Sequence, residues 1–500
     1  MILTIENLRS RDEAQQVDYI GENLDKAFDE GKVPFLEHLL VLAENIVTEL
    51  ESEKLITRVF YNVSNGYSYI RKLSRAGKKD DWQFDQEILF KEVFYLRKAI
   101  QSVGFSEVER ERQCQIYTNL GNTFSYIGRF VDALEMYDCA LQIIQGFPMA
   151  IGNKGYSLFY YARATHNEDH RAILLHKART YLLHALNFPT LLEGDAEKGF
   201  TELLDNIEKI LSDEFKKSTL TLDDFKLSSY EPARNYQLWC LRHRLYINPI
   251  NDLGAHTIAS HDVLNLHSLM VKIKDPPIII DYINLIKQEY SSARYFLFQY
   301  DSGEEDSIPD RDLVLLDTNQ YLLFSHRAEL LKYSLRGLYS ILDKIAFTIN
   351  KYWNLEIPDS KVTFRTIWFE KDRRTLKPFF KDSDNWALRG LFWLSRDFFE
   401  KQDDFQSVLE PQAKELALIR NFVEHKSLKV KRNGPTPEFR LYESEDKSSY
   451  SITASDLQKK VLKLSKLVRS AIIYLIYSID YAESTISKNE SAPIILSRKM

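Results

Sequence analysis

The sequence predicts an all-α protein that is divided into more than one domain. Only 17 Gly and 14 Pro occur in 500 residues, and long segments place apolar residues three and four positions apart, which is the period of an amphipathic helix. A hydrophobic fraction of 44% with 28% charged residues is typical of a folded globular protein. The chain is also too long for one compact core, since a domain usually holds about 100–200 residues.

The first predicted domain, residues 1–215, contains a repeated pattern. The segment YTNLGNTFSYIGRFVDALEMYDCAL, residues 117–141, places its Tyr, Gly and Ala residues at the spacings of a 34-residue tetratricopeptide (TPR) unit. Gly121 and Ala133 would let two antiparallel helices approach closely. A second, interrupted copy begins around Gly155. We therefore expect irregular TPR-like repeats that bind a protein or peptide partner and carry no chemistry; a helical bundle with one chance match is the alternative.

Residues 216–320 differ in character from the repeats. The pairs Asn248-Pro249 and Pro276-Pro277 interrupt the helical pattern. We interpret this stretch as a helical connecting module. It ends in the acidic segment YDSGEEDSIPDRD, residues 300–312, which is expected to be an exposed loop.

Residues 321–485 are expected to form a four-helix bundle, followed by a tail at residues 486–500. The four predicted helices lie at residues 328–353, 385–400, 411–426 and 453–482. In the first of them, leucines and isoleucines from Leu331 to Ile349 form one apolar stripe. Between the last two helices, Asn433-Gly434 suggests a β-hairpin.

Composition and motifs narrow the classes of function. A net charge of −6 gives no overall electrostatic reason to bind nucleic acid, so such binding requires a local basic patch. Three cysteines are too few for a disulfide framework or a tetrahedral zinc site, which favours a reducing cytoplasm. The longest late apolar run, residues 471–477, is far shorter than the roughly 20 residues that span a bilayer, so no membrane association is expected.

Sequence motifs for a metal or a nucleotide cofactor are missing. The sequence contains no H-E-x-x-H or C-x-x-C pattern, no Gly-rich phosphate loop and no G-x-S-x-G elbow. We therefore expect no metal and no cofactor.

The remaining candidate is RNFVEHK at residues 420–426, in which four residues separate Arg420 from His425. The spacing by itself carries little information, because about two such pairs are expected by chance in a chain of this composition. Three others occur in the TPR-like region, namely Arg163 with His170, Arg171 with His176, and Arg179 with His184. Those three are expected to be structural.

The surroundings of Arg420 and His425 distinguish this pair from the others. Asn421 and His425 are four residues apart and so share one helix face, with Arg420 beside it. Residues 420–440 contain six basic residues against two acidic ones. This combination suits a phosphodiester, because a histidine can move a proton and a guanidinium can hold a phosphate through two hydrogen bonds.

These residues, within the predicted third helix and after the segment SLRGLYSILDKIAFTINKYW, resemble the HEPN superfamily, whose ribonuclease members carry Arg-x4–6-His. The resemblance is closer to a bacterial branch in which a HEPN domain follows TPR-like helices. It implies metal-independent cleavage of RNA by a cytoplasmic toxin or antiviral defence protein. The resemblance also implies a homodimer, in which two copies of the motif meet in one cleft.

The resemblance implies a role for each residue that matches the family's motif by position. His425 would be the general acid or base, Arg420 would stabilise the phosphorane, and Asn421 would orient one of them. The products would be a 2′,3′-cyclic phosphate and a 5′-hydroxyl, so the reaction would require the 2′-OH of RNA. Lys426, Lys429, Lys431 and Arg432 are the candidate RNA-binding residues.

Glu424 and Asp343 are auxiliary candidates, with an ordinary helix-surface charge as the alternative reading of each. For the whole chain, the alternative to an endoribonuclease is a non-catalytic protein. In that protein the bundle dimerises or binds a nucleotide, and the repeats act as a scaffold.

Overall fold

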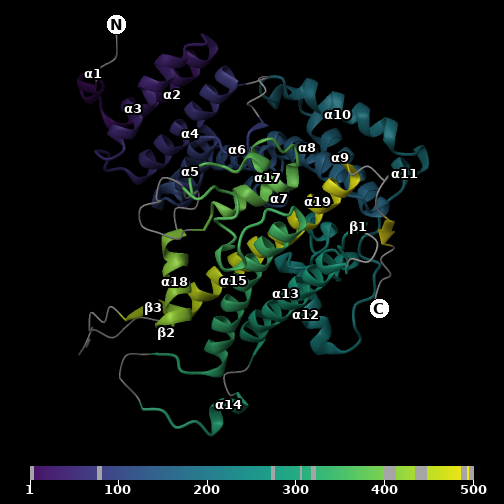
Figure 1. Cartoon of the computed structure of the whole chain (residues 1–500). Helices are drawn as coiled ribbons and strands as arrows, with labels where there is room; N and C mark the ends of the chain where they lie inside the picture. Colours follow the sequence, from purple (N-terminus) through teal and green to yellow (C-terminus); the bar gives the residue numbers. More distant parts are fainter. Residues whose placement is uncertain are drawn as a thin grey trace. The chain divides into compact units, whose positions relative to one another are not determined.

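The computed structural model describes residues 5–75, 82–271, 276–303, 307–316, 322–398, 413–433, 448–485 and 492–494. Most of these residues are helical (Figure 1), so the predicted all-α class is confirmed. Contacts within the chain define two compact units. Among the described residues, unit 1 holds 5–218 and 374–397, and unit 2 holds 219–373, residue 398 and the residues from 413 onwards.

Unit 1 consists of helices that pack in sequential pairs, such as α4 with α5, α6 with α7, and α8 with α9. Its elements are α1 (Ile5–Arg9), α2 (Glu13–Asp29), α3 (Val33–Ile46), α4 (Glu53–Arg75), α5 (Glu87–Gln101), η2 (Val103–Glu107), α6 (Arg110–Tyr126), α7 (Phe130–Ile143), α8 (Pro148–Ala164), α9 (Glu168–Leu186), η3 (Pro189–Leu191), α10 (Ala196–Ile210), α11 (Asp213–Lys217), α16 (Pro378–Lys381) and α17 (Trp386–Ser395).

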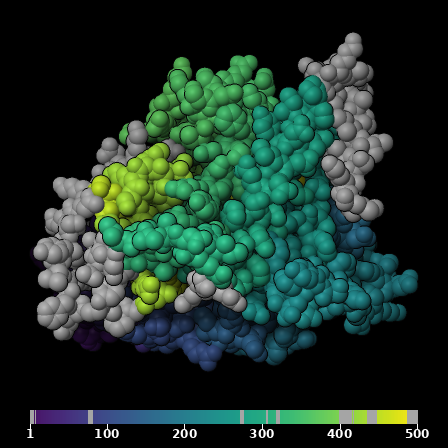
Figure 2. Space-filling model, turned by 90° about the horizontal axis from the view of Figure 1, so that it is seen from below, coloured from purple at the N-terminus to yellow at the C-terminus, as the bar shows by residue number. Residues whose placement is uncertain are grey.

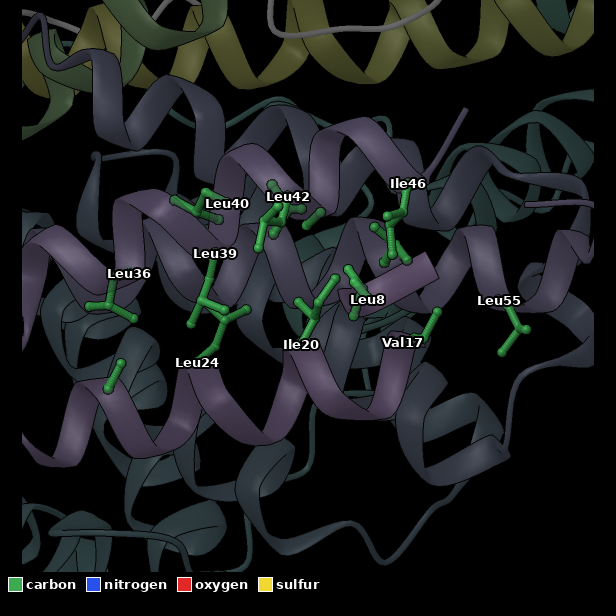
Figure 3. Packing of buried hydrophobic residues seen from close by; sticks show 14 of the residues in the cluster. Leu8, Val17, Ile20, Leu24, Leu36, Leu39, Leu40, Leu42, Ile46 and Leu55 are labelled. Atoms are coloured by element: carbon green, nitrogen blue, oxygen red, sulfur yellow. The ribbon is translucent and has the colours of Figure 1, made fainter. Parts of the chain in front are cut away.

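Apolar side chains hold these helices together. Leu24 of α2 lies against Leu39 of α3 in the buried cluster that also includes residues of α4 (Figure 3). Between α6 and α7, a Cβ atom on Gly121 would lie 2.6 Å from Cε1 of Tyr137, so this glycine permits the close packing that its position predicts. The assignment of these pairs to TPR units stays a prediction.

Unit 2 contains the remaining long helices and the strands. Its elements are α12 (Glu231–His243), η4 (Pro249–Leu253), η5 (Thr257–Ala259), β1 (Leu269–Val271), α13 (Ile278–Ser302), α14 (Ile308–Arg311), α15 (His326–Tyr352), η6 (Asp359–Lys361), α18 (Ala413–His425), β2 (Ser427–Lys431), β3 (Ser449–Thr453), α19 (Ala454–Thr485) and β4 (Ala492–Ile494).

A four-helix bundle is present in unit 2, but its members differ from the predicted set. Helices α13, α15 and α19 pack against one another (Figure 1), and α18 packs against α15. The predicted helix at residues 385–400 is instead α17, which lies in unit 1. Helix α13 takes its place in the bundle. An apolar helix can be recognised from its period, but the period does not say which neighbours bury it.

The segment expected to connect the domains packs into unit 2. Arg469 of α19 is almost fully buried and donates to the carbonyl oxygens of Tyr246 at 2.5 Å and Asn248 at 2.9 Å. It also forms an ion pair with Asp252 at 2.6 Å. The two units meet in sequence at Ser218, whereas the sequence suggested divisions at residues 215 and 320; those boundaries stay predictions.

Two local predictions need correction or restriction. Strands β2 and β3 pair in parallel, whereas the hairpin predicted around Asn433-Gly434 would have its second arm outside the described residues, so that hairpin stays a prediction. Within the predicted loop at residues 300–312, α13 continues to Ser302 and residues 308–311 form α14, while residues 304–306 are outside the described part. No helix in the described segments is long and apolar enough to cross a membrane.

Candidate active site on helix α18

Helix α18 presents one buried and one exposed face. Leu416, Ile419, Phe422 and Val423 are buried, and they recur at the three- and four-residue spacings of a helix stripe. The Phe422 ring stacks on Tyr450 of β3, with centroids 5.7 Å apart. The segment of the chain that contains α18 lies at the surface of the space-filling view (Figure 2).

The sequence-predicted site residues of α18 all lie on its exposed side. Arg420, Asn421, Glu424 and His425 are exposed, and we call these four residues the motif face. Because successive helix residues turn by about 100°, they form two rows, Arg420 with Glu424 and Asn421 with His425. Within the described part of the chain, the Asn421 amide and the His425 imidazole form no hydrogen bond or ion pair.

The first row is held by side chains of α15. The Arg420 guanidinium lies 3.6 Å from the Asp343 carboxylate and over the Tyr339 ring, 5.2 Å from its centroid. Asp343 also accepts a long 3.4 Å hydrogen bond from the Phe364 backbone N–H. Partial burial raises the pKa of Asp343, while Arg420 and the Phe364 N–H act in the opposite direction. The structure thus places Asp343 beside Arg420, and its role as an auxiliary residue stays a prediction.

Arg336 of α15 belongs to the same group, although it was not singled out from the sequence. Its guanidinium donates to the Val423 carbonyl oxygen at 2.6 Å and lies 3.9 Å from the Glu424 carboxylate. Val423 is in the last turn of α18, where carbonyl groups have no partner within the helix. Arg336 therefore fixes the turn that carries His425. The sequence contains a signal that could have identified Arg336, because Arg336, Tyr339 and Asp343 stand three and four residues apart and so share one face of a helix.

The predicted RNA-binding residues lie just after the motif face. In β2, Lys429 and Lys431 are half-buried and alternate with buried Leu428 and Val430, so the two lysines share one face of the strand. Lys426 lies over the Phe422 ring, 5.0 Å from its centroid. Arg432 is exposed, whereas Arg440 lies outside the described residues.

Two of the other three Arg–His pairs lie in α9, and their residues make contacts within unit 1. Arg179 forms an ion pair with Glu208 at 2.5 Å, and Arg171 lies near Glu168 at 3.6 Å. The His176 ring packs edge-on against Phe215, with centroids 5.6 Å apart. These contacts agree with a structural role for that helix. In the described residues, no three His, Cys, Asp or Glu side chains gather as a metal site.

The C-terminal part of the chain is a mostly helical domain built from α13, α15, α18 and α19. It exposes Arg420, Asn421 and His425 on α18, and these residue types are suited to phosphate chemistry. Residues 270–482 match a protein-family model described as LA2681-like HEPN. The chain therefore carries a C-terminal HEPN domain, and the match begins just before α13. No curated protein and no solved structure matches the chain.

Proposed function

We propose that the HEPN domain is a metal-independent endoribonuclease and that the motif face is its active site. The observation that carries the proposal is the position of Arg420, Asn421 and His425. They lie together on the exposed side of a helix within the matched domain, without being used to build the core. A HEPN match supports a ribonuclease-type or nucleotide-related activity.

Each residue has a role that fits its surroundings. The His425 imidazole is exposed, so it can take the proton of a ribose 2′-hydroxyl or supply one to the leaving oxygen. Arg420 can hold the non-bridging phosphate oxygens as negative charge grows on them. Asn421 stands in the row of His425 and can orient it or the phosphate. Lys426, Lys429, Lys431 and Arg432 would attract the RNA backbone.

The pairing of Arg420 with Asp343 does not remove the arginine from this chemistry. Both side chains are more than a third exposed, and an ion pair of that kind contributes only about 0–1 kcal/mol. A phosphate can therefore replace Asp343 at little cost. Until RNA binds, Asp343 and Tyr339 keep the guanidinium at the edge of the motif face. Arg336 positions the last turn of α18 through its hydrogen bond to the Val423 carbonyl oxygen.

The active species in this proposal is a homodimer in which two motif faces form one cleft. We further propose a toxin or antiviral defence role, with the TPR-like unit as sensor or regulator. One observation favours a non-catalytic alternative: both charged residues of the first row are already paired, Arg420 with Asp343 and Glu424 with Arg336. In that alternative, the row only joins α18 to α15.

RNA cleavage separates the two functions. The purified full-length protein is incubated with RNA in the presence of EDTA, alongside His425→Ala and Arg420→Ala variants. The proposal expects cleavage by the wild type that leaves 2′,3′-cyclic phosphates, and a loss of about 10²-fold or more in each variant. Equal behaviour of all three proteins would support the structural role.

A further inference from the structure

Helices α2 and α4 of unit 1 pack against each other and carry polar stripes with the same residue spacing. The stripe of α2 consists of four exposed carboxylates, Asp18, Glu22, Asp25 and Asp29. The stripe of α4 consists of half-buried polar residues, Arg58, Asn62, Asn65 and Tyr69. Residues three and four apart share one face of a helix, so each helix has a polar face beside the apolar one that builds the cluster in Figure 3.

Side-chain contacts join the two stripes at two places. Arg58 forms an ion pair with Asp18 at 2.5 Å. Farther along, the Tyr69 hydroxyl donates to Asp25 at 2.7 Å. Glu22 lies between these two bridges, about one helical turn from each of its neighbours in the stripe. Within the described part of the chain, its carboxylate forms no hydrogen bond and no ion pair. The interface of α2 and α4 is therefore bridged on both sides of Glu22 and open at Glu22 itself.

Helix α6 supplies a cation and a hydrogen-bond partner at the same place. The Arg112 guanidinium lies over the Tyr61 ring of α4, 4.8 Å from its centroid, and makes no ion pair with any described residue. Asn119 donates to the Asn65 side-chain oxygen at 3.3 Å. The amide N–H groups of Asn65 itself have no acceptor among the residues that the structure describes. Donors on Arg112 and Asn65 are therefore available to a ligand.

A cavity of about 160 Å³ lies where these groups meet, and Glu22, Asn65 and Arg112 all line it. Asn62 lines it as well. The Asn62 amide nitrogen donates to the Val17 carbonyl oxygen at 3.3 Å, whereas its amide oxygen accepts no hydrogen bond from the described residues. The cavity is smaller than the roughly 300–1,000 Å³ of sites for drug-sized ligands. Its size excludes a nucleotide and suits a small polar molecule.

Two unpaired charges in the cavity specify the charges of its ligand. Glu22 and Arg112 line the same cavity without forming an ion pair with each other. A carboxylate can bind the guanidinium through two parallel hydrogen bonds, and an ammonium group suits Glu22. A phosphate would be repelled by the carboxylates of the α2 stripe, and a plain amine by Arg112. A neutral peptide group would leave both charges without a partner, whereas a small zwitterion satisfies both.

We propose that this cavity binds a free α-amino acid or an equally small zwitterion. The carboxylate of the ligand accepts hydrogen bonds from Arg112 and from the Asn65 amide. Its ammonium group donates to Glu22 and to the Asn62 amide oxygen. All four residues belong to unit 1, so the inference goes beyond the proposed ribonuclease and does not depend on it.

Isothermal titration calorimetry of the full-length protein tests the proposal with free amino acids, added one at a time. We expect at least one of them to bind with a Kd of about 1 mM or tighter. The best binder is then compared with its α-amide, which lacks the carboxylate, and with its deamino analogue, which lacks the ammonium group. Each derivative should bind the wild type at least about tenfold more weakly, because it loses a charge-assisted hydrogen bond.

Two variants assign each charge of the ligand to a side chain. Arg112→Gln should bind the free amino acid and its α-amide with equal affinity, because the carboxylate has lost its partner. Glu22→Gln should likewise no longer distinguish the free amino acid from its deamino analogue. The first matched control is Arg163→Gln in α8, where the arginine also lies over an aromatic ring, 5.8 Å from the Tyr160 centroid. The second is Glu37→Gln, at an exposed position in α3. Both controls should match the wild type with all three ligands.

Three outcomes overturn the proposal. The first is that no amino acid binds with a Kd of about 1 mM or tighter. The second is that both variants keep the wild-type preference for the free amino acid over its derivatives, which would place the binding elsewhere in the chain. The third is that a terminally blocked peptide with one lysine and one aspartate side chain binds as tightly as the free amino acid. The cavity would then be part of a surface for a protein partner.

Discussion

Replacing Asp480 by asparagine should make the HEPN domain more stable in alkaline solution. Asp480 lies near the end of α19, is 4% exposed, and accepts a hydrogen bond from the His267 backbone N–H at 2.8 Å. Its neighbour Glu483 accepts from the Met270 N–H and the Tyr352 hydroxyl, each at 2.6 Å. Burial raises the pKa of Asp480 to about 7, and the negative charge of Glu483 contributes to this rise.

The magnitude follows from linkage. An aspartate in an unfolded chain has a pKa near 3.8, so between pH 4 and 7 the native state holds a proton that the unfolded state has lost. The contribution of Asp480 to the free energy of unfolding is fully present below pH 4, and it is lost as the pH rises to 7. Three pKa units correspond to about 4 kcal/mol. The buried amide N–H that Asp480→Asn introduces would cost about 1–3 kcal/mol at every pH, so the net gain at pH 8 is about 2 kcal/mol.

The assay is native-state hydrogen exchange of α19 amides at pH 5 and pH 8, because a chain with two units does not unfold in one step. Asp480→Asn should gain about 3 kcal/mol of stability relative to wild type between pH 5 and pH 8, because about two of the three pKa units fall in this interval. An Asp281→Asn variant, at an exposed position in α13, controls for the loss of one charge. A difference between Asp480→Asn and wild type that is the same at both pH values would refute the reasoning.

Two further predictions concern buried and positioning arginines. Asp252→Asn should destabilise unit 2 by about 3–5 kcal/mol, because it leaves the buried Arg469 without its counter-charge. Hydrogen exchange of α19 amides measures this loss. Unchanged exchange would show that the hydrogen bonds to the backbone carbonyl groups are enough to stabilise the Arg469 charge. Arg336→Ala should lower kcat for RNA cleavage about tenfold with little change in KM, since it loosens the last turn of α18, and Arg336→Lys should restore part of the loss. A change confined to KM would mean that Arg336 binds RNA instead.

Helix periodicity was sufficient to predict the fold class and most of the long helices. The stripe from Leu331 to Ile349 is buried as expected, because a helix with one apolar face has to cover it. The assignment of helices to domains was harder. Helix α17 is apolar on nearly every side, and the partners of Asp397 just beyond it, Arg97 and Arg129, lie far away in the sequence. Nothing in a local pattern specifies such long-range ion pairs.

The exposed side of α18 was predictable, since residues four apart in a helix share a face. The residues that hold this face were only partly predictable. Asp343 was selected as an auxiliary residue and lies beside Arg420. Arg336 was missed because its main contact is the Val423 backbone carbonyl; a predicted helix end indicates which carbonyl groups lack a partner, but the sequence does not show which side chain of another helix reaches them. The roles of Arg420, Asn421 and His425 in catalysis stay a proposal.

The most direct test of that proposal is the chemistry of the RNA ends. Wild-type protein and the His425→Ala variant are incubated with an RNA and with the same sequence carrying 2′-deoxy residues, in EDTA. We expect the wild type to cut only the RNA, leaving 2′,3′-cyclic phosphate and 5′-hydroxyl ends, and His425→Ala to be at least about 10²-fold slower. Cleavage of the deoxy substrate, or equal rates for the two proteins, would contradict it.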